Sequence, residues 1–342
     1  MSTIPDISKI KKILLIQYKP FGDILLNTGY MKALREKFPN AQIDYLIQRP
    51  YVTVLENNPY LDNLVIMEKK KKKSLDYFKE KLRIISRIRA ENYDVVIDQL
   101  RNAGSAQITL FSGAKYKIGW RFNKGFKSFN WIYNYSEERN NLVYASRAKF
   151  ALLKPLGIEE IPHNTFYHVK PESREMVNIW LNDSGLIDKK IVLFSPVTPI
   201  PAKQWDLERF AKVADMIKKD SDFEIVLMWG PGEKEQVEYM ASKMETKPVI
   251  APKTSFNEAA ALLEKSKIYI GNDGGINHLA VAVNTPTITV FGPKTNPKKW
   301  TAWHLNIHKY LRDYDFKEKG EHTFNITPEM VFEKFLELKS II

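Results

Sequence analysis

Residues 271–278, Gly-Asn-Asp-Gly-Gly-Ile-Asn-His, are the stretch that decides the fold. They lie between an apolar run of strand length, Ile268–Gly271, and a segment of helical periodicity, Gly275–Val283. Glycine and small polar residues at this position leave the backbone N–H groups at the start of the helix exposed. Together with the helix dipole, such N–H groups form a site for an anion such as a diphosphate. The stretch therefore predicts an α/β unit with a phosphate-binding loop, in which His278 either supports the loop or donates to a phosphate.

The alternation of strand and helix continues on both sides of residues 271–278. The predicted strands are Ile191–Ser195, Glu224–Trp229, Val249–Ala251, Ile268–Gly271 and Thr287–Phe291, and the predicted helices are Asp206–Lys219, Glu233–Met244, Asn257–Glu264 and Gly275–Val283. A terminal helix is predicted from Thr327-Pro328-Glu329, because Thr is a favoured N-cap residue and Pro a favoured first helical residue. Alternation of this kind predicts a parallel sheet with helices on both faces.

The first half of the chain shows the same alternation. The predicted strands are Lys12–Tyr18, Gln42–Ile47, Leu64–Met67 and Val95–Ile97, and the predicted helices are Ile24–Phe38 and one that places Leu75, Phe78, Leu82, Ile85 and Ile88 on a single apolar stripe. The alternation stops in the aromatic and basic segment 121–150, and we place the linker in segment 157–171, which contains two prolines.

Length and composition fit two such units. The chain has 342 residues, against about 150 residues for an average domain. Its 44% hydrophobic and 12% aromatic content exclude intrinsic disorder, collagen-like repeats and a small disulfide scaffold. We therefore predict an α/β protein with two Rossmann-like domains, an N-terminal domain over residues 1–160 and a C-terminal domain over residues 161–342. Ligands of these sheets bind at the carboxyl ends of the strands.

The net charge of +12 lies entirely in the first half. Residues 1–160 carry 28 Lys and Arg against 16 Asp and Glu, whereas residues 161–342 carry 24 against 24. A general bias toward lysine would raise both halves equally. The asymmetry therefore favours an anionic partner for the N-terminal domain.

The sequence has no cysteine, which excludes disulfides, thiolate metal sites and cysteine nucleophiles. No run reaches the 18 or more apolar residues of a membrane span, and the first ten residues lack the apolar core of a signal peptide. We expect a cytoplasmic protein whose contact with a membrane is at most peripheral.

Two loops that follow strands carry candidate catalytic or donor-binding groups. In 19–23, Lys-Pro-Phe-Gly-Asp, Gly22 lets a substrate approach the backbone, and Asp23 is either a helix N-cap or a base that accepts a proton from a hydroxyl. In 195–205, which contains three prolines, Thr198 offers a hydroxyl and Lys203 a charge for a phosphate, although an ordinary surface lysine is the alternative.

Segment 229–233, Trp-Gly-Pro-Gly-Glu, ends another strand of the C-terminal domain. Glu233 can bind two ribose hydroxyls, as the acidic residue of a dinucleotide fold does, or it can simply start a helix. The G-x-x-x-x-G-K-[ST], H-E-x-x-H and EF-hand patterns are absent, and the six histidines do not cluster at ligand spacing. Asp313-Tyr314-Asp315 matches a metal-binding D-x-D pattern, but it stands outside the predicted strand ends. We therefore predict chemistry without a metal or any other cofactor.

In combination, these motifs resemble glycosyltransferase family 9, the bacterial lipopolysaccharide heptosyltransferases. The resemblance rests on Gly-Asp at 22–23, Pro-Ala-Lys-Gln-Trp at 201–205, Gly-Pro-Gly-Glu at 230–233 and Asn-Asp-Gly-Gly at 272–275 with His278 following, and then on the segments 285–287 and 291–293. It spans about residues 12–294 plus the terminal helix. Each motif alone is weak, whereas four in family order and spacing are specific.

The resemblance implies a GT-B fold, two Rossmann-like domains facing across a cleft, and transfer of heptose from an ADP-heptose donor with inversion and without metal. It gives Asp23 the role of general base. It assigns donor binding to Thr198, Lys203, Glu233, Asp273, Gly274, Gly275 and His278. The family usually has Asp-[Ser/Thr]-Gly where this chain has Asp273-Gly274-Gly275, and small residues where it has Lys19-Pro20-Phe21, so the donor and the acceptor position stay open.

The implied acceptor, lipopolysaccharide core on an anionic leaflet, fits the basic N-terminal domain. Candidate acceptor-binding residues are Gly22, Lys69, Lys70, Arg101 and Arg121, and the lysine run 69–73 is a candidate for contact with the inner leaflet or for a solvated loop. The alternatives are a member of the family with another sugar donor, a nucleotide-sugar epimerase, and a binding protein without catalysis. Nucleic acid is not the expected partner.

Overall fold

The computed structural model describes residues 6–71, 74–122, 127–159, 165–314 and 324–342, and the chain divides into two compact units, Met1–Phe166 and Tyr167–Ile342. We call them unit 1 and unit 2. The predicted domain boundary after residue 160 lies outside the described residues. Both units are built on a six-stranded sheet in which every pair of neighbouring strands is parallel.

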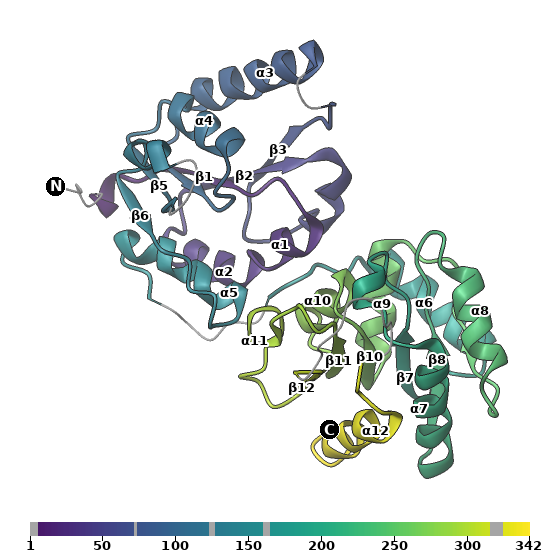
Figure 1. Cartoon of the computed structure of the whole chain (residues 1–342). Helices are drawn as coiled ribbons and strands as arrows, with labels where there is room; N and C mark the ends of the chain where they lie inside the picture. Colours follow the sequence, from purple (N-terminus) through teal and green to yellow (C-terminus); the bar gives the residue numbers. More distant parts are fainter. Residues whose placement is uncertain (1–5, 72–73, 123–126, 160–164, 315–323) are drawn as a thin grey trace. The chain divides into compact units, whose positions relative to one another are not determined.

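Unit 1 has the strand order β3-β2-β1-β4-β5-β6. The strands are β1 Lys12–Ile16, β2 Gln42–Gln48, β3 Asn63–Met67, β4 Val95–Asp98, β5 Tyr116–Trp120 and β6 Tyr135–Glu137. The helices are α1 Phe21–Leu25, α2 Thr28–Lys37, α3 Leu75–Glu91, α4 Ala103–Phe111 and α5 Ala145–Ala148, with short 3-10 helices η1 Ile7–Lys9, η2 Arg49–Val54, η3 Lys127–Ile132 and η4 Lys149–Leu156. Helices α3 and α4 lie on one face of the sheet, and α1, α2 and α5 lie on the other (Figure 1).

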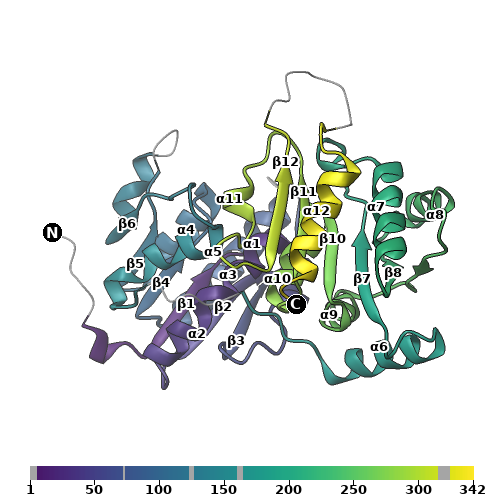
Figure 2. The ribbon, with the colours of Figure 1, turned by 90° about the horizontal axis from the view of Figure 1, so that it is seen from below.

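Unit 2 repeats this order, with β12-β11-β10-β7-β8-β9. The strands are β7 Lys190–Ser195, β8 Phe223–Leu227, β9 Val249–Ile250, β10 Ile268–Asn272, β11 Thr287–Phe291 and β12 His308–Arg312. The helices are α6 Pro171–Asp183, α7 Leu207–Asp220, α8 Lys234–Ser242, α9 Phe256–Lys265, α10 Gly275–Ala282, α11 Pro297–Trp300 and α12 Pro328–Lys339, with the 3-10 helix η5 Pro201–Lys203. Helix α12 packs beside α7 on one face of the sheet (Figure 2).

The central strands are buried on both faces, as apolar strands of a parallel sheet are. Every residue of β10 and β11 is buried, and so is every residue of β7 after Lys190. The core of unit 2 places Trp205 and Phe210 edge to face, with ring centroids 4.7 Å apart. The predicted cap of the terminal helix is confirmed, since the Thr327 side chain accepts a hydrogen bond from the Met330 N–H.

Two predictions about unit 1 are wrong. The segment predicted as one helix, Ile24–Phe38, forms two helices, α1 and α2. Helix α3 forms, but it buries only part of the predicted apolar stripe. Ile88 is buried and Ile85 packs against the core, whereas Leu75, Phe78 and Leu82 are 69%, 53% and 66% exposed. Ile84, which is not in the predicted stripe, is also buried.

The side of α3 that faces the sheet is chosen by a polar group as well as by apolar ones. Glu80 is buried on that side, and its carboxylate accepts hydrogen bonds from the Glu68 N–H, at 2.7 Å, and from the Arg83 guanidinium. Both sets of apolar residues recur at helical spacing, so periodicity alone cannot distinguish them. Among the described residues, no helix combines the length and the apolar character needed to cross a bilayer.

Candidate functional site

The strand order places a crevice in unit 2 at the carboxyl ends of β7 and β10. The chain runs from β7 outward to β9 and then crosses back to β10, so the connections that leave these two neighbouring strands diverge. Ligands of doubly wound sheets bind at this switch point. A cavity of about 470 Å³ opens there, and we call it the switch-point cavity. It is lined by Ser195, Val197, Thr198, Pro199, Met228, Trp229, Gly230, Pro231, Glu233, Thr254, Ser255, Phe256, Ala259, Tyr269, Asn272, Gly274, Gly275 and Ile276.

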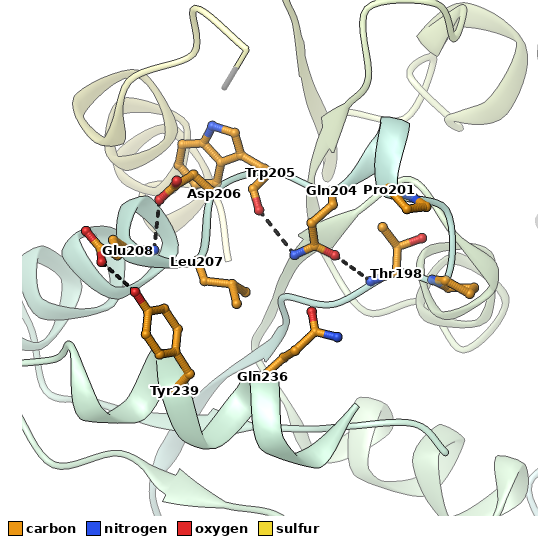
Figure 3. A pocket seen from close by; sticks show the side chains of 10 residues that line it. Thr198, Pro201, Gln204, Trp205, Asp206, Leu207, Glu208, Gln236 and Tyr239 are labelled. Carbon is orange, nitrogen blue, oxygen red and sulfur yellow. Dashed lines mark hydrogen bonds between the residues drawn. The ribbon is translucent and has the colours of Figure 1, made fainter. Parts of the chain in front are cut away.

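The amide side chain of Gln204 holds the loop between β7 and α7. Its Oε1 accepts a hydrogen bond from the Thr198 N–H at 2.8 Å, and its Nε2 donates to the carbonyls of Pro196 and Trp205 (Figure 3). Asn272 at the end of β10 completes the arrangement, because its Nδ2 donates to Pro196 O and its Oδ1 accepts from the Trp205 N–H. These contacts fix the place of Thr198 at the cavity.

Gly271 allows β10 and β7 to approach each other closely. A Cβ atom on Gly271 would lie 2.4 Å from the hydroxyl oxygen of Tyr269 and 2.7 Å from the carbonyl oxygen of Ser195. Gly274, three residues later, is different, since its nearest neighbour would be the Asn272 carbonyl oxygen at 4.0 Å. A side chain therefore fits at position 274 but not at position 271.

Helix α10 begins at the cavity with its N–H groups uncapped by a side chain. Gly274 is the N-cap residue and makes no side-chain cap, and both Gly274 and Gly275 line the cavity. An uncapped helix N-terminus offers several N–H donors and a partial positive charge to an anion. The loop predicted to bind phosphate thus lies at a cavity of a size that suits part of a nucleotide.

Glu233 stands at the other side of the same cavity. It occupies the N-cap position of α8, but its carboxylate does not cap the helix; it turns back to accept a hydrogen bond from the Gly230 N–H at 2.7 Å. Burial raises the pKa of this carboxyl group above its ordinary value, and the Gly230 hydrogen bond opposes that shift. The backbone of Glu233 therefore starts a helix, as one of the two alternatives predicted, while its carboxylate lies at the cavity wall.

Three predicted donor-binding residues do not line the cavity. Lys203 Nζ lies 2.5 Å from Asp273 Oδ2, and the Asp273 side chain is almost fully buried, so these two residues form an ion pair beside the phosphate loop. His278 is buried in α10, with its ring centroid 6.0 Å from that of Trp300. Thr198, Glu233, Gly274 and Gly275 are the predicted residues that line the cavity itself.

Sequence reasoning missed the wall formed by Thr254, Ser255 and Phe256. Ser255 caps α9 in a capping box, in which its side chain accepts from the Glu258 N–H and Glu258 accepts from the Ser255 N–H. The spacing Ser-x-x-Glu at 255–258 is the sequence signal for such a cap. It would have placed the start of α9 at the carboxyl end of β9, next to the cavity.

A second cavity of about 480 Å³ shares Thr198 and Pro199 with the first. Figure 3 shows side chains that line this second cavity. Its walls include the carboxyl groups of Asp206 and Glu208 and the exposed ring of Tyr239. Carboxylates repel a diphosphate, whereas the switch-point cavity offers it helix N–H groups. The switch-point cavity is therefore the better nucleotide site.

Unit 1 has its own switch point, at the carboxyl ends of β1 and β4. Asp23 lies there as the third residue of α1, and the N-cap position belongs to Pro20, so the alternative role of Asp23 as the helix N-cap does not hold. The Asp23 side chain is one-quarter exposed, and its Oδ1 lies 4.0 Å from Arg139 Nη2. Nothing in the sequence around Arg139 marked it as a neighbour of Asp23.

Lys149 is buried beneath α1. Its Nζ donates to the Asp23 carbonyl oxygen at 2.9 Å and to Asn27 Oδ1, and Asn27 Nδ2 donates to the Tyr45 hydroxyl at 2.7 Å. Burial lowers the pKa of Lys149 to about 7, although the nearby Asp23 charge opposes this shift. The network fixes the backbone that carries Asp23, and it places a second cation near that carboxylate.

The predicted acceptor-binding residues all follow strands of the unit 1 sheet, at its carboxyl edge. Gly22 lies in α1 beside Asp23, and Arg101 has a left-handed backbone, with φ of 51°, and acts electrostatically on Arg139. Lys69 and Lys70 are exposed after β3, and Arg121 is exposed after β5. The structure thus associates Arg101 with the Asp23 site.

Among the described residues, no group of three or more potential ligands could hold a metal ion. Asp313 directly follows β12, so the expectation that it stands outside the strand ends is wrong. Its carboxylate is buried and accepts a hydrogen bond from the Asn325 N–H at 3.0 Å. Asp315 lies outside the described residues.

Two Rossmann-like units, each with a parallel six-stranded sheet and a switch point at the carboxyl ends of its strands, define a protein of the GT-B class. The chain belongs to glycosyltransferase family 9 (heptosyltransferase), whose family model matches residues 81–325. It is therefore a glycosyltransferase.

Relatives with known names or structures agree with this assignment. Lipopolysaccharide heptosyltransferase 3 of Escherichia coli is 27% identical over 322 residues, which are 90% of this chain and 93% of the relative. The glycosyl transferase family 9 structure from Veillonella parvula is 24% identical, with a TM-score of 0.84 over 96% of this chain and 97% of the other. An E. coli heptosyltransferase solved with ADP-2-deoxy-2-fluoro heptose is 19% identical, with a TM-score of 0.73 over 96% of this chain and 99% of the other.

Proposed function

We propose that this protein transfers heptose from ADP-heptose to a hydroxyl group of lipopolysaccharide core, with inversion and without a metal ion. The observation that carries the proposal is the switch-point cavity of unit 2. The uncapped N-terminus of α10 and the Glu233 carboxylate both line this cavity. Membership of the family supports the type of transfer, and the names of the relatives support the sugar and the acceptor.

On this proposal, unit 2 holds the donor. The N–H groups at the start of α10 bind the diphosphate, and the Glu233 carboxylate accepts hydrogen bonds from ribose hydroxyls. The Lys203 ammonium, oriented by its ion pair with Asp273, neutralises charge that develops on the phosphates. His278 supports α10 through its packing on Trp300.

Unit 1 supplies the base and the acceptor. The acceptor oxygen attacks the anomeric carbon from the face opposite ADP while the bond from that carbon to the phosphate oxygen breaks. Asp23 takes the hydroxyl proton, and ADP departs with the electron pair. Lys203 and the N–H groups of α10 neutralise the negative charge on the departing ADP, so this step needs no metal ion. Arg139 lies beside the Asp23 carboxylate, and Lys149 holds the backbone carbonyl of Asp23 in place.

The acceptor is a lipid-linked, anionic saccharide, and the surplus of positive charge in unit 1 supports this assignment. Arg101 is the candidate acceptor contact near Asp23. The proposal includes peripheral contact of the protein with the inner leaflet of the cytoplasmic membrane. Another nucleotide sugar as donor is the second candidate, because Gly274 lacks the hydroxyl that the family usually places there.

The roles of Asp23 and Lys203 are tested by separating turnover from donor binding. Asp23→Asn removes the base but keeps the size of the side chain, so we expect ADP release to fall by about 10²–10⁴-fold, with ADP affinity unchanged. Lys203→Met should lower both the rate of ADP release and the affinity for ADP. The measurements are ADP release and calorimetric titration of ADP with the full chain. Near-normal turnover by Asp23→Asn would contradict the proposed mechanism.

A further inference from the structure

Helix α3 presents a second apolar face, and that face is exposed. Leu75, Phe78 and Leu82 lie on one stripe of the helix, because they are three and four residues apart. They are 69%, 53% and 66% exposed, whereas Ile84 and Ile88 on the other side are buried in the core of unit 1. Single exposed apolar side chains are normal, but a contiguous stripe indicates a surface that meets something apolar.

Exposed cations lie before this stripe and along the helix, and Asp76 is an exposed carboxylate in its first turn. Lys69, Lys70 and Lys71 are exposed directly before the helix, and Lys79 and Arg89 are exposed on the helix itself. None of these five makes an ion pair with a residue that the structure describes, whereas Arg49 and Arg83 nearby are paired with Glu68 and Glu80. The free cations and the apolar stripe therefore occur together.

We propose that Leu75, Phe78 and Leu82, together with Lys69, Lys70 and Lys71, form a docking surface for an anionic lipid bilayer. We call these six residues the α3 surface. A helix with apolar side chains on one face and cations around it lies in the interface of a bilayer, with its apolar residues among the acyl chains and its cations at the lipid phosphates. The long lysine side chains suit this arrangement because their ammonium groups can reach the headgroups while their stems cover apolar surface.

The α3 surface lies at the edge of the sheet where the Asp23 site lies. In a parallel sheet all carboxyl ends share one edge, and α3 follows the carboxyl end of β3 as Asp23 follows that of β1. Tyr77 in the first turns of α3 packs in the same core cluster as Tyr18, which follows β1. Docking through this surface would bring that edge to the membrane. This consequence rests on the proposed function, since it assumes a lipid-linked acceptor.

The test is binding of the full chain to vesicles, measured by sedimentation. Vesicles of phosphatidylglycerol and phosphatidylethanolamine are compared with vesicles of phosphatidylcholine alone. We expect binding to the anionic vesicles only, and a loss of at least about tenfold in the triple variant Leu75→Ser, Phe78→Ser, Leu82→Ser. Lys69→Gln, Lys70→Gln, Lys71→Gln should lose a similar amount, and should lose it mainly at low salt.

A control variant removes exposed apolar side chains from another helix. Met176→Ser with Ile179→Ser removes exposed apolar residues from α6 of unit 2, and should bind vesicles as the unchanged chain does. Unchanged binding by the apolar α3 variant would overturn the proposal. The proposal would also be overturned if the unchanged chain bound no vesicles and formed a dimer through this face. In that case the solution mass of the unchanged chain would be that of a dimer, and the mass of the apolar α3 variant would be that of a monomer.

A transfer assay keeps this proposal distinct from the proposed function. The apolar α3 variant should retain turnover on a short water-soluble core acceptor and lose turnover on an acceptor embedded in anionic vesicles. Equal loss on both acceptors would contradict a docking role. If the unchanged chain binds anionic vesicles through α3 but transfers heptose to neither acceptor, the proposed function fails and the docking surface stands.

Discussion

At the scale of single residues, two glycines near the end of β10 differ in the space around them: Gly271 is closely packed and Gly274 is not. Gly271 cannot carry a side chain because the Tyr269 hydroxyl and the Ser195 carbonyl lie where its Cβ would be. Gly274 has open space beside it and an extended backbone, with φ of −166° and ψ of −172°, that any residue adopts. The sequence shows both simply as glycines, so their different roles could only be read from the structure.

Gly274→Ser should therefore fold normally and improve the donor site. Its hydroxyl would stand at the N-cap of α10, where the family usually has Ser or Thr. We expect a free energy of unfolding equal to or slightly above that of the unchanged chain, and tighter binding of ADP-heptose by several-fold. Denaturant unfolding and calorimetric titration measure the two quantities. Gly271→Ala is the contrasting variant, for which we expect a loss of about 1–3 kcal/mol.

Lys149 makes stability depend on pH. Its folded-state pKa of about 7 lies below the ordinary lysine value, so above pH 7 the unfolded chain holds a proton that the folded chain has released. The free energy of unfolding therefore gains from this group as the pH rises from about 7 toward about 10.4, and gains nothing below pH 7.

The variant Lys149→Met should remove that gain, by up to a few kcal/mol at the top of the range. Urea unfolding at several pH values, with Lys212→Met at an exposed lysine of α7 as control, measures it. Equal pH dependence of all three chains would show that Lys149 is charged in the folded state throughout this range.

At the scale of secondary structure, the strands that form the two sheet centres were predictable because they are apolar runs bounded by turn residues. Strand β11 was predicted with its observed bounds, and β2, β7 and β10 to within one residue at each end. Strands β5, β6 and β12 were not predicted, since Tyr116–Trp120, Tyr135–Glu137 and His308–Arg312 mix polar and apolar residues. Strands β6 and β12 are edge strands, and β5 is the neighbour of β6. The exposed face of α3 shows the limit of periodicity, because both faces of that helix carry apolar residues.

The residue that caps α9, Ser255, also lines the switch-point cavity. Ser255→Ala removes the side-chain acceptor of the capping box and should cost about 1 kcal/mol in the free energy of unfolding. Because Ser255 lines the switch-point cavity, ADP should also bind more weakly.

Thr327→Ala removes the equivalent cap of α12, which is not part of that cavity. It should cost a similar amount of stability and leave ADP affinity unchanged. Thermal unfolding and ADP titration of both variants measure the difference. Equal loss of ADP affinity in the two variants would mean that stability, and not the cavity wall, controls binding.

At the scale of the whole molecule, each unit repeats the strand order 3-2-1-4-5-6 of Rossmann folds, and the charge differs between them. The residues of the phosphate loop, Thr198 and Glu233 could be predicted as a site because motifs after strand ends meet at one edge of a sheet. Arg139 and Lys149 could not, since they come from segments without periodicity and reach Asp23 only through packing. Unit 2 is neutral overall, so the proposed function requires it to bind a diphosphate with a few placed groups. Unit 1 carries the surplus charge, which suits the proposed anionic acceptor.

The most direct test of the proposed function is the product formed by the full chain from ADP-heptose and a core acceptor in the presence of EDTA. We predict release of one ADP for each heptose transferred, and a new glycosidic bond whose anomeric configuration, read by NMR, is opposite to that of the donor. Consumption of another nucleotide sugar with none of ADP-heptose, a retained configuration, or loss of all turnover in EDTA would contradict the account.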